Sequence, residues 1–156
     1  MPRKSKQAIV DELIREFRAT VNQDDAFDSL AAKQLGISET DLRCVNIVEN
    51  SSGLSAGELA AQSGLTAGAI TGVIDRLEKV GYARRVSNSV DRRRIRVEVT
   101  ASFYRSAERI WGPVATDWHA TLTQRFTSEE LELFSSFLRT TNELGGRHLD
   151  RLRKHR

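Results

Sequence analysis

Apolar residues recur every three or four positions along the first part of the chain, which is the spacing of one face of an α-helix. The pattern extends from Gln7 to about Gly36, and a polar run at residues 22–25 divides it. We therefore expect a helix that is interrupted at this run and ends at Gly36, because glycine often terminates helices. Ser38 and Asp41 then form a capping pair that predicts the start of a shorter helix.

Two short helices joined by a glycine-containing turn are predicted between residues 55 and 81. Ser55 and Glu58 have the spacing of a capping box that opens the first helix, and Thr66 caps the second. The second helix is apolar on one face and small, hydroxylated or charged on the other. Its apolar stripe is Ile70, Val73, Ile74, Leu77 and Val80, and its other face is Gly68, Thr71, Gly72, Asp75, Arg76 and Lys79. This arrangement is typical of a helix-turn-helix.

The hydrophobic period changes to two after Gly81, which indicates β-strands. Residues 82–87 predict one strand, and the alternation of Ile95, Val97 and Val99 with polar residues predicts another. The loop between them, NSVDRRR, places three consecutive arginines at the tip of a hairpin. A helix-turn-helix followed by a hairpin is a winged helix, which we assign to residues 38–100.

The remainder of the chain predicts two further helices. Thr100 can cap a helix that extends to Arg125, and Gly112–Pro113 is expected to kink or interrupt it. Thr127 and Glu130 form a capping box for the last helix. Its expected buried residues are Leu131, Phe134, Phe137 and Leu138. The predicted fold class is mainly α with a small β-hairpin wing, flanked by N-terminal and C-terminal helices.

Length and composition favour one soluble domain of 156 residues, with 39% hydrophobic and 29% charged residues. No run of about 18 apolar residues is present, so we expect no membrane span. A single cysteine suits a reducing cytoplasm, where we expect the protein to act. Charge is segregated, because residues 66–100 contain eight basic and four acidic residues while residues 7–65 are net acidic. A basic block of this kind indicates a polyanionic partner.

The basic block and the polar face of the second helix suggest contact with double-stranded DNA. Each glycine on that face costs about 1 kcal/mol of helix propensity against alanine. Close approach to a DNA groove and close packing of helices both explain this cost. An arginine at the wing tip can enter the minor groove, and Asp91 can position Arg93 for this. The candidate DNA-binding residues are Thr66, Gly68, Thr71, Gly72, Arg76, Asp91, Arg92, Arg93 and Arg94.

These residues carry a resemblance to the MarR family, the multiple antibiotic resistance regulators. It covers "ELA…GL", "ITGVIDRLEKVGY" and a D-x-R wing pattern, here Asp91 and Arg93. The resemblance implies a homodimer, with residues 1–37 and 101–156 as the dimerisation helices, on a pseudo-palindromic operator. It also implies a repressor relieved by an aromatic or lipophilic effector, bound between the long helix and the winged region. Many relatives carry a larger polar or basic residue at the position of Gly72, so base readout there is expected to be weak.

A winged helix that binds protein without specific DNA binding is the main alternative, and the basic block argues against it. An enzyme is not expected, because no acid, base and nucleophile converge in the sequence. Cys44 lies between Leu42 and Val45, which favours burial over redox sensing. His119, His148 and His155 lack companion ligands at metal spacing, so we expect no metal and no cofactor.

Overall fold

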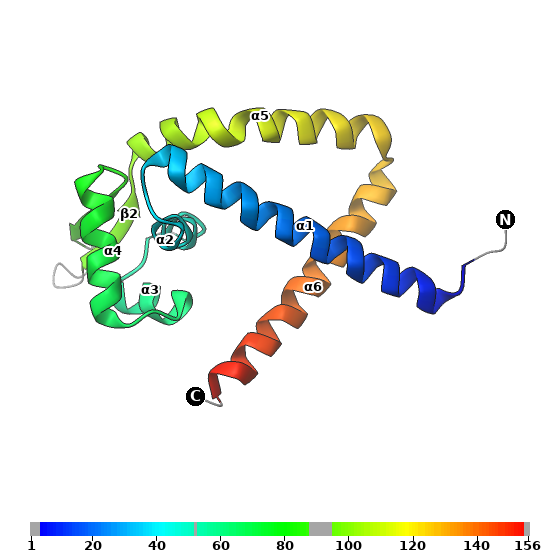
Figure 1. Ribbon diagram of the computed structural model, residues 1–156, viewed down its shortest axis with the longest axis horizontal. Helices are drawn as coiled ribbons and strands as arrows, with labels where there is room; N and C mark the ends of the chain where they lie inside the picture. Colours follow the sequence, from blue (N-terminus) through cyan, green and yellow to red (C-terminus); the bar gives the residue numbers. More distant parts are fainter. Residues whose placement is uncertain (1–3, 52, 88–94, 155–156) are drawn as a thin grey trace. The chain divides into compact units, whose positions relative to one another are not determined.

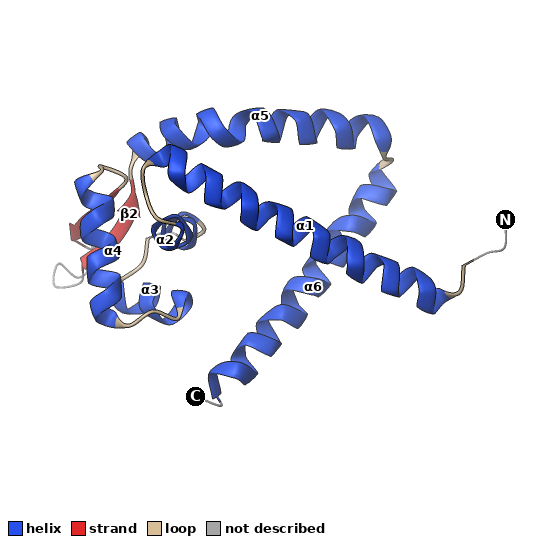
Figure 2. Ribbon diagram, in the orientation of Figure 1, coloured by secondary structure: helices blue, strands red, loops and turns tan. Residues whose placement is uncertain are grey.

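The computed structural model of the chain describes residues 4–51, 53–87 and 95–154. They form six helices and one antiparallel hairpin, which confirms the predicted fold class (Figures 1 and 2). The elements are α1 (Lys6–Leu35), α2 (Glu39–Glu49), α3 (Ala56–Ser63), α4 (Ala67–Lys79), β1 (Ala83–Ser87), β2 (Ile95–Val99), α5 (Ala101–Arg125) and α6 (Ser128–Lys154). Two compact units divide the chain, residues 1–110 and residues 111–156.

The helices begin at the residues that the capping patterns predicted. Ser38 with Asp41 and Ser55 with Glu58 form complete capping boxes at the starts of α2 and α3. Thr66 accepts a hydrogen bond from the amide of Ala69 at the start of α4. These side chains satisfy amides that the first helical turn leaves without a partner. The ends of the short helices are therefore fixed by local chemistry.

The core of the first unit lies among α2, α3, α4, the hairpin and the start of α5. Its largest fully buried apolar side chains are Leu42, Val45, Leu59, Ile70, Val73, Ile74, Leu77, Val97 and Phe103. In α1 the buried residues are confined to its last turns: Ala31, Ala32 and Leu35. The apolar stripe predicted for α4 thus forms the centre of this core. Val80 is the exception, with 43% of its surface exposed, because it caps the helix where the chain leaves at Gly81.

The hairpin pairs β1 with β2 in the register Arg85 opposite Val97. Leu54, just before α3, adds a short bridge to the other side of β2 through two backbone hydrogen bonds with Val97, of 3.3 and 2.7 Å. The hydroxyl of Tyr82 donates to the carbonyl of Leu35 at 3.3 Å, and its ring meets Phe103 edge to face. The base of the hairpin is therefore joined to α3, to the end of α1 and to the start of α5.

Two predicted interruptions do not occur. The helix α1 continues through residues 22–25, because polar side chains break an apolar stripe without breaking the backbone hydrogen bonds. The helix α5 continues through Gly112–Pro113, since a proline removes one hydrogen bond and the flanking turns retain theirs, while the alternative of a kink there stays a prediction. Among the described residues, no helix is long and apolar enough to span a membrane.

The expected burial of the apolar side of α6 is also wrong for the single chain. Phe134 keeps 42% and Leu138 keeps 49% of its surface exposed, although Phe134 packs edge to face on Phe126. Leu131 is half-buried, and Phe137 is exposed at 36%. The second unit contains only α6 and the later part of α5, which is too little structure to cover this side.

Candidate nucleic-acid interface

One face of α4 is buried and the opposite face is open to solvent. Ile70, Val73 and Leu77 pack inward, toward α2 and α3. Thr66, Gly68, Thr71 and Arg76 are exposed, and Gly72 between them is half-buried. The structure therefore leaves four of the five candidate residues of this region exposed on α4 or at its N-cap, and α4 itself lies beside the hairpin (Figure 1).

The two threonines of this surface use their hydroxyl groups within the helix. Thr66 Oγ1 accepts from the amide of Ala69 at 3.3 Å, and Thr71 Oγ1 donates to the carbonyl of Ala67 at 3.1 Å. Thr71 can therefore offer a partner an acceptor oxygen and a methyl group, while its hydroxyl hydrogen stays in the helix. A methyl group can contact the methyl of a thymine in a major groove.

The surroundings of Gly68 distinguish between the two explanations for a glycine inside this helix, close packing against another helix and close approach to DNA. A Cβ atom built on Gly68 meets no other atom within 4 Å. Packing between the helices of the described chain therefore does not require glycine at this position. Close approach of another molecule remains a physical reason for the missing side chain.

Arg76 is held by a carboxylate from a different helix. Its Nε donates to Asp41 Oδ2 at 3.1 Å and its Nη2 donates to Oδ1 at 2.7 Å, which is a two-point pair. The side chain of Asp41 is 3% exposed, whereas that of Arg76 is 56% exposed. The sequence marked Asp41 only as a capping residue, because no local pattern indicates a partner 35 positions away.

The charged state of Asp41 is favoured by these contacts. Burial acts to raise the pKa of the Asp41 carboxyl, but the hydrogen bonds from Arg76 and Ser38 outweigh it and lower the pKa below its ordinary value. Asp41 therefore remains ionised. Its negative charge partly neutralises the positive charge of Arg76 on the side of α4 that is next to α2.

The wing is attached to α4 by a second arginine. Arg85 on β1 pairs with Asp75 at 2.7 Å and with Glu78, and its amide donates to Glu78 Oε1 at 2.8 Å. These partners raise the pKa of Arg85, with the hydrogen bond that Arg85 donates to Asp75 as the main cause. Arg84, its neighbour, points to Glu98 on β2 at 3.1 Å. Neither arginine stood out in the sequence, where both belonged to the basic block.

The tip of the wing, residues 88–94, lies outside the described residues. The candidates Asp91, Arg92, Arg93 and Arg94 belong to this segment, and their role stays a prediction from the sequence. The strands that flank the tip end at Ser87 and begin at Ile95. Both strand ends therefore belong to the hairpin that Arg85 ties to α4.

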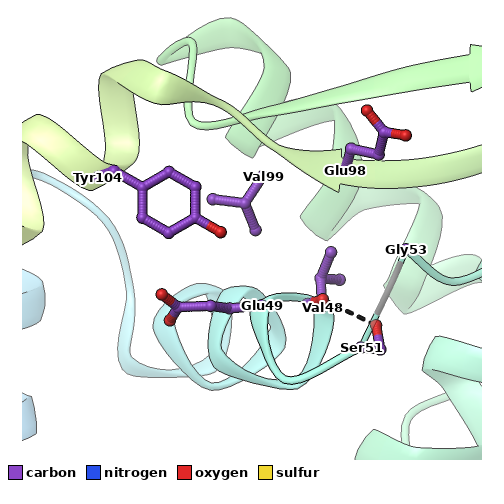
Figure 3. A pocket seen from close by; sticks show the side chains of 7 residues that line it. All are labelled: Val48, Glu49, Ser51, Gly53, Glu98, Val99 and Tyr104. Carbon is purple, nitrogen blue, oxygen red and sulfur yellow. Dashed lines mark hydrogen bonds between the residues drawn. The ribbon is translucent and has the colours of Figure 1, made fainter.

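A pocket of about 260 Å³ lies where α2, β2 and the first turn of α5 meet. Figure 3 shows the ring of Tyr104 and the side chain of Val99 above α2, with the carboxylate of Glu49 below the Tyr104 hydroxyl. Ser51 closes one end and donates to the carbonyl of Val48 at 2.7 Å. The site is at the junction of a long helix with the winged region, where the resemblance placed an effector.

Cys44 is fully buried, as the sequence predicted, and burial raises the pKa of its thiol. A raised pKa lowers the fraction of reactive thiolate at neutral pH. In the part of the chain that the structure describes, no three His, Cys, Asp or Glu residues are grouped to hold a metal ion.

Comparisons with known proteins agree with this geometry. The family model for the MarR family matches residues 37–95. The uncharacterized HTH-type transcriptional regulator YcgE of Bacillus subtilis is 30% identical over 152 residues, which cover 97% of this chain and 98% of YcgE.

Solved structures with the same fold include one protein bound to a ligand and one bound to DNA. NadR in complex with 4-hydroxyphenylacetate is 27% identical with a TM-score of 0.56, over 90% of this chain and 97% of NadR. A mutant of S. aureus MepR bound to an oligodeoxyribonucleotide is 18% identical with a TM-score of 0.53, over 86% of this chain and 96% of MepR. At this identity the likeness to MepR concerns the fold alone.

Proposed function

Since the chain belongs to the MarR family of DNA-binding transcriptional regulators, we propose that it is a homodimeric repressor that leaves its operator when a small-molecule effector binds. The exposed face of α4 carries this proposal. Its polar and small residues lie over an apolar stripe that is buried except at Val80, so the helix presents them on a rigid support. In a helix-turn-helix, the second helix enters the major groove with such a face.

In this proposal the two ends of the surface contact different parts of the DNA. Thr66, Gly68, Thr71 and Gly72 face base edges in the major groove, where small residues permit close approach. Arg93 enters the minor groove, while Arg92 and Arg94 bind phosphates on either side. The backbone contacts fix the position of the protein, and the base contacts provide its sequence preference.

The proposed dimer is supported by apolar side chains that the single chain leaves exposed. On α1, Ile9 keeps 45% and Leu13 keeps 46% of its surface exposed, and on α5 Trp118 keeps 58%. Exposed apolar surface on this scale is typical of a subunit interface. A homodimer also presents two copies of α4, which matches a pseudo-palindromic operator.

The proposed effector is an aromatic or lipophilic small molecule, and the pocket beside Tyr104 offers it one aromatic ring within a mainly polar lining that includes Glu49 and Glu98. An occupant there would contact α2, β2 and α5 at once. It could therefore change the position of the wing relative to the long helix. NadR, with its bound 4-hydroxyphenylacetate, supports a ligand of this class.

Selection of binding sites from random duplex DNA with the full-length protein tests the function. We expect an enriched inverted repeat, bound by a species of twice the chain mass in sedimentation. A screen of aromatic compounds, with uncharged and cationic members beside 4-hydroxyphenylacetate, should yield a compound that releases the selected DNA. Tyr104→Ala should weaken this release and leave the affinity for DNA unchanged. Failure to enrich any sequence would favour the alternative, a winged helix that binds protein.

A further inference from the structure

We infer that Asp41 holds the guanidinium of Arg76 away from DNA, in place of the DNA contact expected from the sequence, so that the first turns of α4 meet the major groove with uncharged side chains. The inference rests on the proposed function in one respect, that α4 is the helix that enters the groove. It assigns Asp41, which does not itself touch DNA, as a positioning residue for sequence specificity.

The geometry of Asp41 leaves it little freedom. Both oxygens of its carboxylate pair with Arg76, at 3.1 and 2.7 Å, and Oδ2 also accepts from the amide of Ser38 at 3.4 Å. In return, Ser38 Oγ accepts from the amide of Asp41 at 3.1 Å. The residue is 2% exposed and anchored at the first turn of α2. The anchor for Arg76 is therefore rigid.

The guanidinium of Arg76 passes beside Gly72 on its way to this anchor. Gly72 lies four residues before Arg76, where side chains of a helix meet one another. A Cβ atom on Gly72 would lie 3.4 Å from Arg76 Nη1, in van der Waals contact. The guanidinium therefore lies next to Gly72 while it pairs with Asp41 of α2. The contact of this Cβ atom has an ordinary length, so the chain itself accommodates an alanine at Gly72 as it does at Gly68.

Asp75, the residue before Arg76 on α4, is also paired with a residue outside the helix. Asp75 pairs with Arg85 of β1 at 2.7 Å, and Arg76 pairs with Asp41 of α2. These two successive residues thus reach to opposite neighbours of the helix. What remains toward the start of α4 is uncharged: Thr66, Ala67, Gly68, Ala69 and Thr71.

The pair also persists in the presence of DNA for a physical reason. Removing Arg76 from Asp41 would leave a buried carboxylate without its counter-charge, which is costly. An unrestrained arginine would instead bind phosphates of any sequence and raise non-specific affinity. Holding it on Asp41 therefore increases the ratio of specific to non-specific binding.

The salt dependence of DNA binding tests the inference directly. Each phosphate contact contributes about 0.9 to the slope of log Kobs against log salt. We expect Arg76→Gln to leave this slope unchanged on selected and on random DNA. The matched control is Arg92→Gln at the wing tip, which should lower the slope by about one. A loss of about one unit in Arg76→Gln would overturn the inference.

A second variant releases the arginine instead of removing it. Asp41→Asn keeps the size of the side chain and its ability to accept from Ser38, but removes the charge. We expect tighter binding to random DNA, a slope about one unit steeper, and a lower ratio of specific to non-specific affinity. In the double variant Asp41→Asn with Arg76→Gln, the slope should return to the wild-type value. A wild-type slope in Asp41→Asn would overturn the inference.

These measurements also separate the inference from the proposed function. If the protein selects no DNA, or if Arg92→Gln leaves the slope unchanged, the proposed DNA contact at the wing fails. If DNA is bound and Arg92→Gln behaves as expected, the slope of Arg76→Gln decides the inference. The salt slope is measured on folded protein, so a loss of stability in Arg76→Gln does not affect it as long as the variant stays folded. Far-UV circular dichroism under the titration conditions checks that it does.

Discussion

Arg85 of β1 and Asp75 of α4 are joined by an ion pair with 2.7 Å between Nη2 and Oδ1. The same arginine also pairs with Glu78, one helical turn further along α4. Its side chain is 33% exposed, so water screens these contacts only in part. Together these contacts of Arg85 are the principal polar link between the wing and α4 among the described side chains.

Loss of this link should be measurable as a loss of stability. We expect Arg85→Gln to lower the free energy of unfolding by about 1 kcal/mol, because several charge-assisted hydrogen bonds are removed together. Arg84→Gln is the matched control, since it removes the same charge from an exposed pair, with 64% and 39% exposure. Its cost should be about 0.5 kcal/mol or less. Urea denaturation of both variants at one protein concentration provides the comparison, and equal costs would contradict the prediction.

Substitution of Gly68 by alanine should raise the stability of the protein and weaken its binding to DNA. Gly68→Ala introduces a side chain into open space and a better helix former, so we expect the protein to gain up to about 1 kcal/mol of stability. If the helix approaches DNA closely here, the same methyl group should weaken binding to the selected operator. Thermal unfolding and DNA titration of one preparation measure the two effects.

The control for this prediction is Gly57→Ala. Gly57 is also the second residue of a helix, α3, and a Cβ atom there also meets nothing within 4 Å. We expect a similar gain in stability and a smaller change in affinity, because in a helix-turn-helix the first helix crosses the DNA backbone outside the groove. Equal losses of affinity in the two variants would argue against close approach at Gly68.

The short elements of the fold could be predicted from the sequence because their signals are local. Ser55 and Glu58 are three residues apart, and the box that they form defines the start of α3. The alternation around Val97 similarly identified β2 as a strand. Signals of this kind depend on neighbours in the chain, so one sequence contains them in full.

The parts that could not be predicted depend on residues distant in sequence. The anchor for Arg76 is 35 positions away, and the bridge between Leu54 and Val97 spans a comparable length. The burial expected for Leu138 was wrong because an apolar stripe indicates that a face is covered without indicating what covers it. Long-range partners of these kinds become visible only in three dimensions.

The ionisation of Asp41 should make stability depend on pH in a defined direction. Its pKa is lowered in the folded protein, so it contributes stability above the unfolded pKa of about 3.9 and loses it as pH falls through the folded value. The stability gap between wild type and Asp41→Asn should therefore be constant from about pH 7 to pH 5 and should close below about pH 4. Urea midpoints across this range measure the gap, and parallel curves down to pH 3 would contradict the prediction.

The wing tip offers a test in which the sign of the effect is informative. If Asp91 holds Arg93 in position for the minor groove, Arg93→Ala should cost about 1–3 kcal/mol of binding free energy, the value of one good specific contact. Asp91→Ala should also weaken binding, although it makes the wing more positive. Counterion release alone predicts the opposite, because removal of an acid near the phosphates favours association.

The neighbouring arginines provide the comparison that completes this test. Arg92→Ala and Arg94→Ala, as losses of phosphate contacts, should each reduce the salt slope by about one unit and affect all sequences alike. Arg93→Ala should instead reduce the preference for the selected operator over random DNA. All four variants are titrated against both DNAs at several salt concentrations. Tighter binding by Asp91→Ala, together with equal losses for the three arginines, would mean that the wing contributes positive charge and no positioned contact.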